Sequence, residues 1–144
     1  MADASWFPST NQTMIKEDIQ ENILRVLDKY ESVVLFAYLF GSTASAESKP
    51  SGDIDIAVFL AGGTSGPYFE TKLSLFGDLC RALKRNDVDL VVLNTATNLV
   101  LLDEIVRTGL LLIDREPDAR SDFELRILHN SMDFRQQRMA IMGV

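Results

Sequence analysis

Two aspartates, Asp53 and Asp55, are the residues whose type and spacing most directly suggest chemistry in this sequence. They lie two positions apart in an otherwise apolar run, and on a strand this spacing places both carboxylates on one face. Adjacent carboxylates repel each other and raise each other's pKa unless a cation lies between them. Because Mg²⁺ binds a few carboxylates together with phosphate oxygens and water, the pair predicts a site for a divalent metal and a phosphate-bearing ligand.

A second feature, Gly41 followed by Ser42, is typical of a turn that binds anions. The two residues end an apolar run at residues 33–40, and ten residues separate Ser42 from Asp53. A strand that passes through such a turn into a helix leaves backbone N–H groups free to bind phosphate. Glycine allows close approach of phosphate oxygens, and the serine hydroxyl can donate a further hydrogen bond. Together with the aspartate pair, this turn predicts a metal–triphosphate site.

A third carboxylate, Asp89, begins another apolar run at residues 88–93. If this run is a strand beside the Asp53–Asp55 strand, Asp89 can complete a second metal position and accept a proton from an attacking hydroxyl. Two metal ions about 3.5–4 Å apart stabilise both the attacking and the leaving oxygen of an in-line displacement. Asp87 lies on the same face of this segment, nearer the preceding loop, and is the less favoured alternative to Asp89.

The elements that must position these residues follow from hydrophobic periodicity and from the Gly- and Pro-containing breaks. Helices are expected at residues 14–30, 68–84, 98–108 and 117–142, and strands at residues 33–40, 53–60, 88–93 and 110–114. Ser42 is also placed to cap a short helix after the turn. The alternation of helices and strands predicts an α/β (α+β) domain built on one sheet.

Length and composition restrict the function classes. A chain of 144 residues fits one compact domain, which we expect at residues 13–144 after a flexible N-terminal tail at residues 1–12. The net charge of −7 makes nucleic acid a poor candidate partner. A single cysteine, Cys80, and a single histidine, His129, argue against a zinc site and a serine–histidine triad. No apolar run approaches the roughly 18 residues of a membrane span, and no signal peptide is recognisable, so a cytoplasmic location is expected.

The pattern of Gly-Ser, ten residues, then Asp-x-Asp resembles that of the DNA polymerase β-like nucleotidyltransferase superfamily. The segments at residues 88–94, 104–112 and 133–135 narrow the resemblance to the MntA-type minimal nucleotidyltransferases, which are the antitoxins of HEPN–MNT toxin–antitoxin pairs. The resemblance covers roughly residues 35–135, and it implies the polymerase β-like fold, with a small mixed sheet of about four strands flanked by helices.

The resemblance also implies an activity and a partner. In that family the antitoxin uses ATP and Mg²⁺ to attach AMP to a tyrosine hydroxyl of a HepT-type HEPN toxin, which is an RNA-cleaving protein. We therefore expect ATP, two Mg²⁺ ions and a hetero-oligomer with a HEPN toxin, without direct binding of nucleic acid. Carried over residue by residue, Gly41 and Ser42 hold the triphosphate, while Asp53, Asp55 and Asp89 bind metal and form the catalytic set.

One segment departs from the family pattern. Relatives usually carry Ala-Arg-Gly or Ala-Lys-Gly shortly after Gly-Ser, whereas this chain has Ser45 and Ala46 in place of the last two residues. Lys49 is the candidate that would replace the missing cation as a triphosphate ligand. The departure supports one alternative, an antitoxin that acts mainly by binding its toxin. A second alternative rests on the shared motif alone: a nucleotidyltransferase acting on a small molecule, as the aminoglycoside-modifying enzymes do, although those enzymes typically have a further helical domain.

Overall fold

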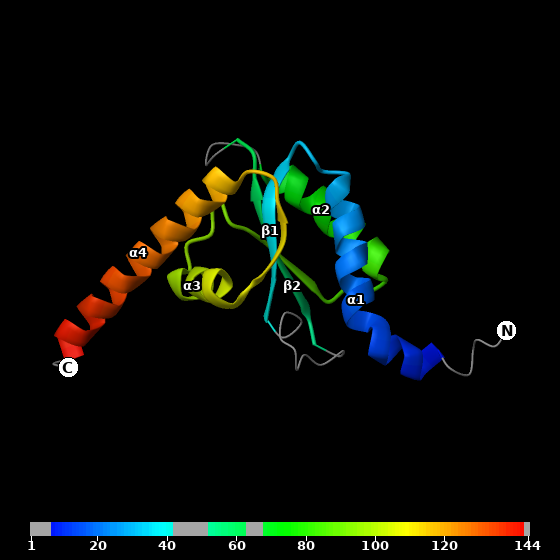
Figure 1. The fold of residues 1–144 in the computed structure, drawn as a ribbon, viewed down its shortest axis with the longest axis horizontal. Coiled ribbons are helices and arrows are strands. Elements are labelled where there is room, and N and C mark those ends of the chain that lie inside the picture. The colour runs from blue at the N-terminus through cyan, green and yellow to red at the C-terminus, as the bar shows by residue number, and fades with distance from the viewer. Residues whose placement is uncertain (1–6, 42–51, 63–67, 143–144) are drawn as a thin grey trace.

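The computed structural model of the chain describes residues 7–41, 52–62 and 68–142 (Figure 1). Its elements are α1 (Phe7–Asp28), β1 (Val34–Phe40), β2 (Ile54–Leu60), α2 (Tyr68–Leu83), β3 (Val88–Val92), α3 (Leu99–Thr108), β4 (Leu110–Asp114) and α4 (Pro117–Met142). The four strands form one sheet in the order β3-β2-β1-β4. β1 pairs antiparallel with both β2 and β4, whereas β3 runs parallel to β2, so the predicted small mixed sheet is confirmed.

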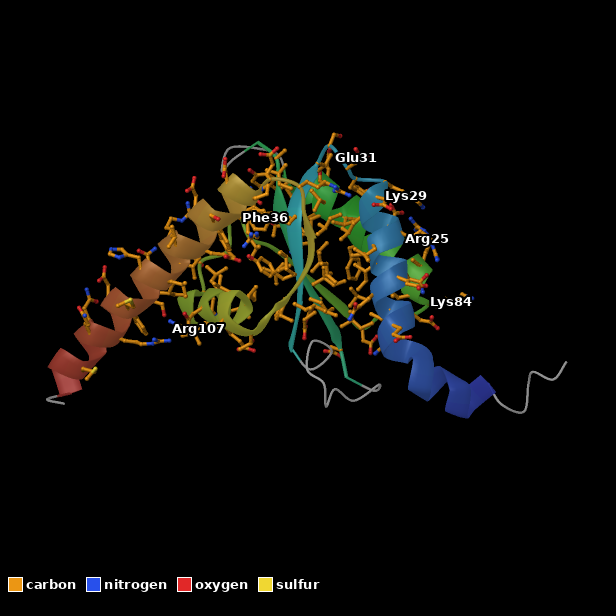
Figure 2. All side chains as sticks on the ribbon, in the orientation of Figure 1. Arg25, Lys29, Glu31, Phe36, Lys84 and Arg107 are labelled. Carbon is orange, nitrogen blue, oxygen red and sulfur yellow. The ribbon has the colours of Figure 1, made fainter. Side chains whose placement is uncertain are left out.

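Helices cover both faces of the sheet. In Figure 1, α1 and α2 lie on one side of the sheet and α3 and α4 lie on the other. The two sides match the alternation of the strands: Ile54 and Ile56 belong to the core under α1 and α2, and Ala57 belongs to the core under α3 and α4. Figure 2 shows Phe36 on the α3–α4 side, while Arg25 lies on the outer side of α1, away from the sheet. Because both faces are covered, β1 and β2 are almost continuously apolar.

Helix α1 begins at Phe7, whereas the periodicity predicted a start near residue 14, so part of the predicted tail at residues 1–12 is helical. The apolar spacing marks only the part of the helix that packs on the sheet, and the first buried side chain of the described part is Ile19. Backbone hydrogen bonds continue a helix beyond its packed face, and Pro8 is tolerated because it lies in the first turn. Residues 1–6 lie outside the described ranges.

Helix α4 is fixed to the sheet at its N-terminal half and extends beyond the sheet at its C-terminal half (Figure 1). Among the side chains of α4 that the structure describes, the buried apolar ones are those of Phe123 and Ile127. The buried hydroxyl of Tyr38 on β1 donates a hydrogen bond to Glu124. Arg120 donates to Glu124 at 3.0 Å and to Asp114 at 2.8 Å, so one network joins β1, β4 and α4.

A Tyr38→Phe variant is expected to lose about 1.5–3 kcal/mol of unfolding free energy, because it removes a buried hydrogen bond to a charged acceptor. The matched control is Tyr68→Phe, which loses only a neutral bond of 3.2 Å from Asn94 and should cost less. Urea denaturation of both variants measures the difference. Equal losses, or a Tyr38→Phe variant as stable as the wild-type protein, would contradict the role of this network.

No helix within the described ranges has both the length and the apolar character needed to cross a bilayer.

Candidate active site

The predicted carboxylates lie where β1 ends and where β2 and β3 begin. Phe40, the last residue of β1, is the antiparallel partner of Asp55 on β2. Asp55 is in turn the parallel partner of Asp89 on β3. Gly41 directly follows Phe40, and Asp53 directly precedes β2. The sheet therefore brings Gly41 and the three aspartates to one end, although they come from three separate segments of the chain.

The carboxylates of Asp55 and Asp89 project from the face of the sheet that α3 and α4 cover. Paired residues on neighbouring strands point to the same face, and Phe40, the partner of Asp55, belongs to the core on that side. Asp55 is half-buried, whereas Asp53 and Asp89 are exposed. One carboxylate is thus held against the protein and two remain open to a ligand.

Negative charge is concentrated around Asp55. The pKa of the Asp55 carboxyl is raised from 3.8 to about 6, first by burial and then by the nearby charges of Asp89 and Asp53 and a hydrogen bond with Asp89. The charge of Glu104 on α3 adds a smaller effect of the same sign. A cation placed among these groups would relieve the repulsion.

Glu104 was not identified as a site residue from the sequence, because its approach to Asp55 depends on how α3 crosses the sheet. Helix α3 buries Leu102 and Ile105 against the core. Glu104 directly precedes Ile105, and nothing in the local sequence indicates that its side chain lies near an aspartate on β2. Within the described residues, no three His, Cys, Asp or Glu side chains are already gathered tightly enough to hold a metal ion by themselves.

Gly41 is fitted closely against Asp55. Its φ of 74° lies in the left-handed region, which glycine adopts without strain. A Cβ atom built at this position would collide with Oδ2 of Asp55. Both the backbone conformation and the space therefore require glycine here, while the binding of phosphate at this turn stays a prediction.

Asp87, the alternative to Asp89, is engaged elsewhere. Its two carboxylate oxygens accept hydrogen bonds of 2.6 Å from Nε and Nη2 of Arg85. This pairing lowers the pKa of the Asp87 carboxyl, and it leaves Asp89 as the β3 carboxylate beside Asp55. The sequence contained a signal for this pair, since Arg85 and Asp87 are two residues apart before a strand, but we assigned no role to Arg85.

Several predicted site residues lie outside the described ranges. They are Ser42 and Lys49, the candidate triphosphate ligands, together with Ser45 and Ala46, which depart from the family pattern. Their roles remain predictions from the sequence.

The raised pKa of Asp55 gives a test in the absence of divalent metal. A carboxyl whose folded-state pKa exceeds its unfolded value stabilises the fold fully below pH 3.8, and this contribution is lost as the pH rises through about 6. We expect an Asp55→Asn variant to gain thermal stability relative to the wild-type protein between pH 4 and pH 6.5, with the gain levelling off above that range. Thermal unfolding in EDTA at a series of pH values measures this difference. A difference that stays constant or shrinks with pH would contradict the crowded environment of Asp55.

The chain matches the family model for "Polymerase beta, Nucleotidyltransferase" over residues 21–118, a span that contains Gly41, both aspartates of the pair and Asp89. It belongs to this nucleotidyltransferase family. No curated protein sequence matches it.

Solved structures of toxin–antitoxin complexes contain similar chains. One complex with AMP-PNP has a chain with 28% identity and a TM-score of 0.68, and the match covers 86% of this protein and 95% of that chain. The MntA–HepT pair has a chain with 26% identity and a TM-score of 0.63, with coverage of 87% and 94%. The complex of the tri-AMPylated HEPN toxin of Shewanella oneidensis with its MNT antitoxin has a chain with 26% identity and a TM-score of 0.64, with coverage of 89% and 96%. The nucleotidyltransferase described here therefore resembles MntA antitoxins over nearly its whole length.

Proposed function

We propose that this protein is an antitoxin that transfers AMP from ATP to a tyrosine hydroxyl of a HEPN toxin, in a reaction that requires Mg²⁺. The observation that carries the proposal is the meeting of Asp53, Asp55 and Asp89 beside Gly41 at one end of the sheet. The similar chains found in complexes with AMP-PNP and with an AMPylated HEPN toxin support the choice of nucleotide and partner.

The donor set fits a magnesium ion. Carboxylates, phosphate oxygens and water are its preferred ligands. Burial, followed by the charges of Asp89 and Asp53, raises the pKa of Asp55 to about 6, and a cation would offset the part of this shift that comes from the neighbouring carboxylates. Asp53, Asp55 and Asp89 would hold the metal, with the triphosphate and water supplying the remaining ligands. When bound, Mg²⁺ neutralises charge on the phosphates and on the departing pyrophosphate.

The residues of the chain would act mainly by positioning and by accepting a proton. The backbone at Gly41 would approach the triphosphate closely, because no side chain intervenes there. The tyrosine oxygen forms a bond to the α-phosphorus, the bond from that phosphorus to the bridging oxygen breaks, and pyrophosphate leaves. Asp89, exposed at the edge strand β3, would accept the hydroxyl proton.

The experiment that tests this function combines the purified protein with Mg²⁺, ATP and the HEPN toxin of its own genome. Intact-mass spectrometry of the toxin is expected to show the addition of one or more AMP units. An Asp53→Asn/Asp55→Asn double variant should still bind the toxin but leave its mass unchanged.

Parallel measurement of RNA cleavage separates the enzyme from an antitoxin that acts only by binding. The enzymatic proposal predicts that the toxin stays inactive after the antitoxin is removed. A toxin that keeps its original mass, and that regains RNA cleavage once the antitoxin is removed, would contradict the enzymatic proposal and favour inhibition by contact.

A further inference from the structure

Arg85 lies in the short turn between α2 and β3. The backbone conformation of this turn places it at the end of the sheet where the aspartates lie. Helix α2 ends with Lys84 in the left-handed region at φ 57°, a conformation that residues with a side chain rarely adopt. The N–H of Arg85 then donates to the carbonyl of Cys80 at 3.2 Å, which closes the helix in the manner of a Schellman motif. This termination places Arg85 directly before the strand that carries Asp89.

The guanidinium of Arg85 joins two segments that carry the proposed site. Its Nε and Nη2 each donate a 2.6 Å hydrogen bond to Asp87, and Nη2 also donates to the carbonyl of Gly52 at 2.7 Å. Gly52 immediately precedes Asp53, and Asp87 lies two residues before Asp89. The side chain of Arg85 is only 21% exposed, so these bonds are partly shielded from solvent.

We propose that Arg85 is a positioning residue that clamps the start of β2 to the start of β3, and so sets the distance between the metal-binding carboxylates of Asp53 and Asp89. This inference rests on the proposed function of the site. The backbone supports the clamp, because the N–H of Ile54 donates to the carbonyl of Asp87 at 3.0 Å in the same place. Arg85 itself touches neither the metal nor the nucleotide in this role.

Arg85 also neutralises the negative charge of Asp87 at the end of the sheet where the other three aspartates lie. Without its guanidinium, the carboxylate of Asp87 would add to the repulsion among Asp53, Asp55 and Asp89, all of which lie at the same end of the sheet. In this arrangement the first three carboxylates are available to a metal ion, while the carboxylate of Asp87 stabilises the fold by pairing with Arg85.

Geometry distinguishes this role from a simple need for positive charge. A planar guanidinium can bond both oxygens of Asp87 and the carbonyl of Gly52 at fixed angles, whereas a lysine ammonium is a point charge without this fork. An Arg85→Lys variant keeps the charge but loses the clamp. Substitutions of groups that orient metal ligands typically weaken metal affinity or activity about 10- to 100-fold.

The test measures binding of a fluorescent ATP analogue to the full-length protein, with Mg²⁺ and separately in EDTA, so that no acceptor protein is needed. The Arg85→Lys variant is expected to bind the Mg²⁺-loaded analogue about 10- to 100-fold more weakly than the wild-type protein, with no change in EDTA. The matched control is Arg81→Lys, which changes an exposed arginine that pairs with Asp78 within α2. Helix α2 lies on the opposite side of the sheet from α3 and α4, whose side carries the carboxylates, so this variant should bind as the wild-type protein does (Figure 1). Circular dichroism melts establish that each variant is folded.

Full Mg²⁺-dependent affinity in the Arg85→Lys variant, or equal losses with Mg²⁺ and in EDTA, would overturn the positioning role. If that variant does not fold, Asp87→Asn breaks the same fork from the other side and must show the same selective loss of Mg²⁺-dependent affinity. A wild-type protein that binds the analogue equally well with Mg²⁺ and in EDTA would instead contradict the proposed metal site, and the role of Arg85 with it.

Discussion

An Asp55→Asn variant is expected to transfer AMP about 100- to 1,000-fold more slowly than the wild-type protein, the range typical for loss of one preorganised electrostatic group in an active site. Asp55 is the half-buried member of the carboxylate set, and it lies between Gly41 on one side and Asp89 on the other. Asparagine keeps the shape of the side chain but cannot carry the charge that holds a cation.

This loss should accompany a gain in stability, because the substitution removes a carboxyl whose pKa is raised to about 6 by burial and by neighbouring charges. Single-turnover AMP transfer and thermal unfolding in EDTA, measured on one preparation, test both parts. The matched control is Asp122→Asn, a change at an exposed position of α4 that should leave both quantities near their wild-type values. Normal AMP transfer by the Asp55→Asn variant would show that Asp55 is not part of the active site.

A Gly41→Ala variant is expected to lose both stability and activity. An L-residue in the left-handed region costs roughly 1–2 kcal/mol, and the new Cβ would also displace the Asp55 carboxylate from its present position. A displacement of about 1 Å at a catalytic group can reduce the rate about 100-fold. Urea denaturation measures the first loss, and the rate of AMP transfer measures the second.

Gly62→Ala is the matched control for this prediction. Gly62 also has a positive φ, of 105°, but a Cβ at that position would meet no atom of the described residues within 4 Å. The control variant should therefore lose stability without losing AMP transfer. Equal activities of the two variants would show that contact between position 41 and Asp55 has no catalytic consequence.

Much of the fold was predictable, because β1 and β2 are buried on both faces and all four strands read as short apolar runs. The bounds predicted for the four strands differ from those observed by at most one residue at either end. The alternation in β2 also correctly placed the side chains of Asp55 and Ile56 on opposite faces. The start of α1 was predicted wrongly, because a helix continues by backbone hydrogen bonding where side-chain periodicity gives no signal.

The proximity of the site residues was only partly predictable. The motif spacing indicated that Gly41 and Asp55 would be close, and the pairing of β1 with β2 brings them into contact. The effect of Glu104 on Asp55 depends on the crossing of α3 over the sheet, which no local pattern encodes. The bond from Arg85 to Gly52 spans 33 residues of the chain and likewise required the structure.

The most direct test of the central claim is a crystal structure of the protein with Mn²⁺ and a non-hydrolysable ATP analogue, with the metal located by its anomalous scattering. The account predicts Mn²⁺ bound to the carboxylates of Asp53, Asp55 and Asp89, with the triphosphate against the backbone at Gly41. Metal and nucleotide bound elsewhere on the protein, or a nucleotide bound without metal at these carboxylates, would contradict it.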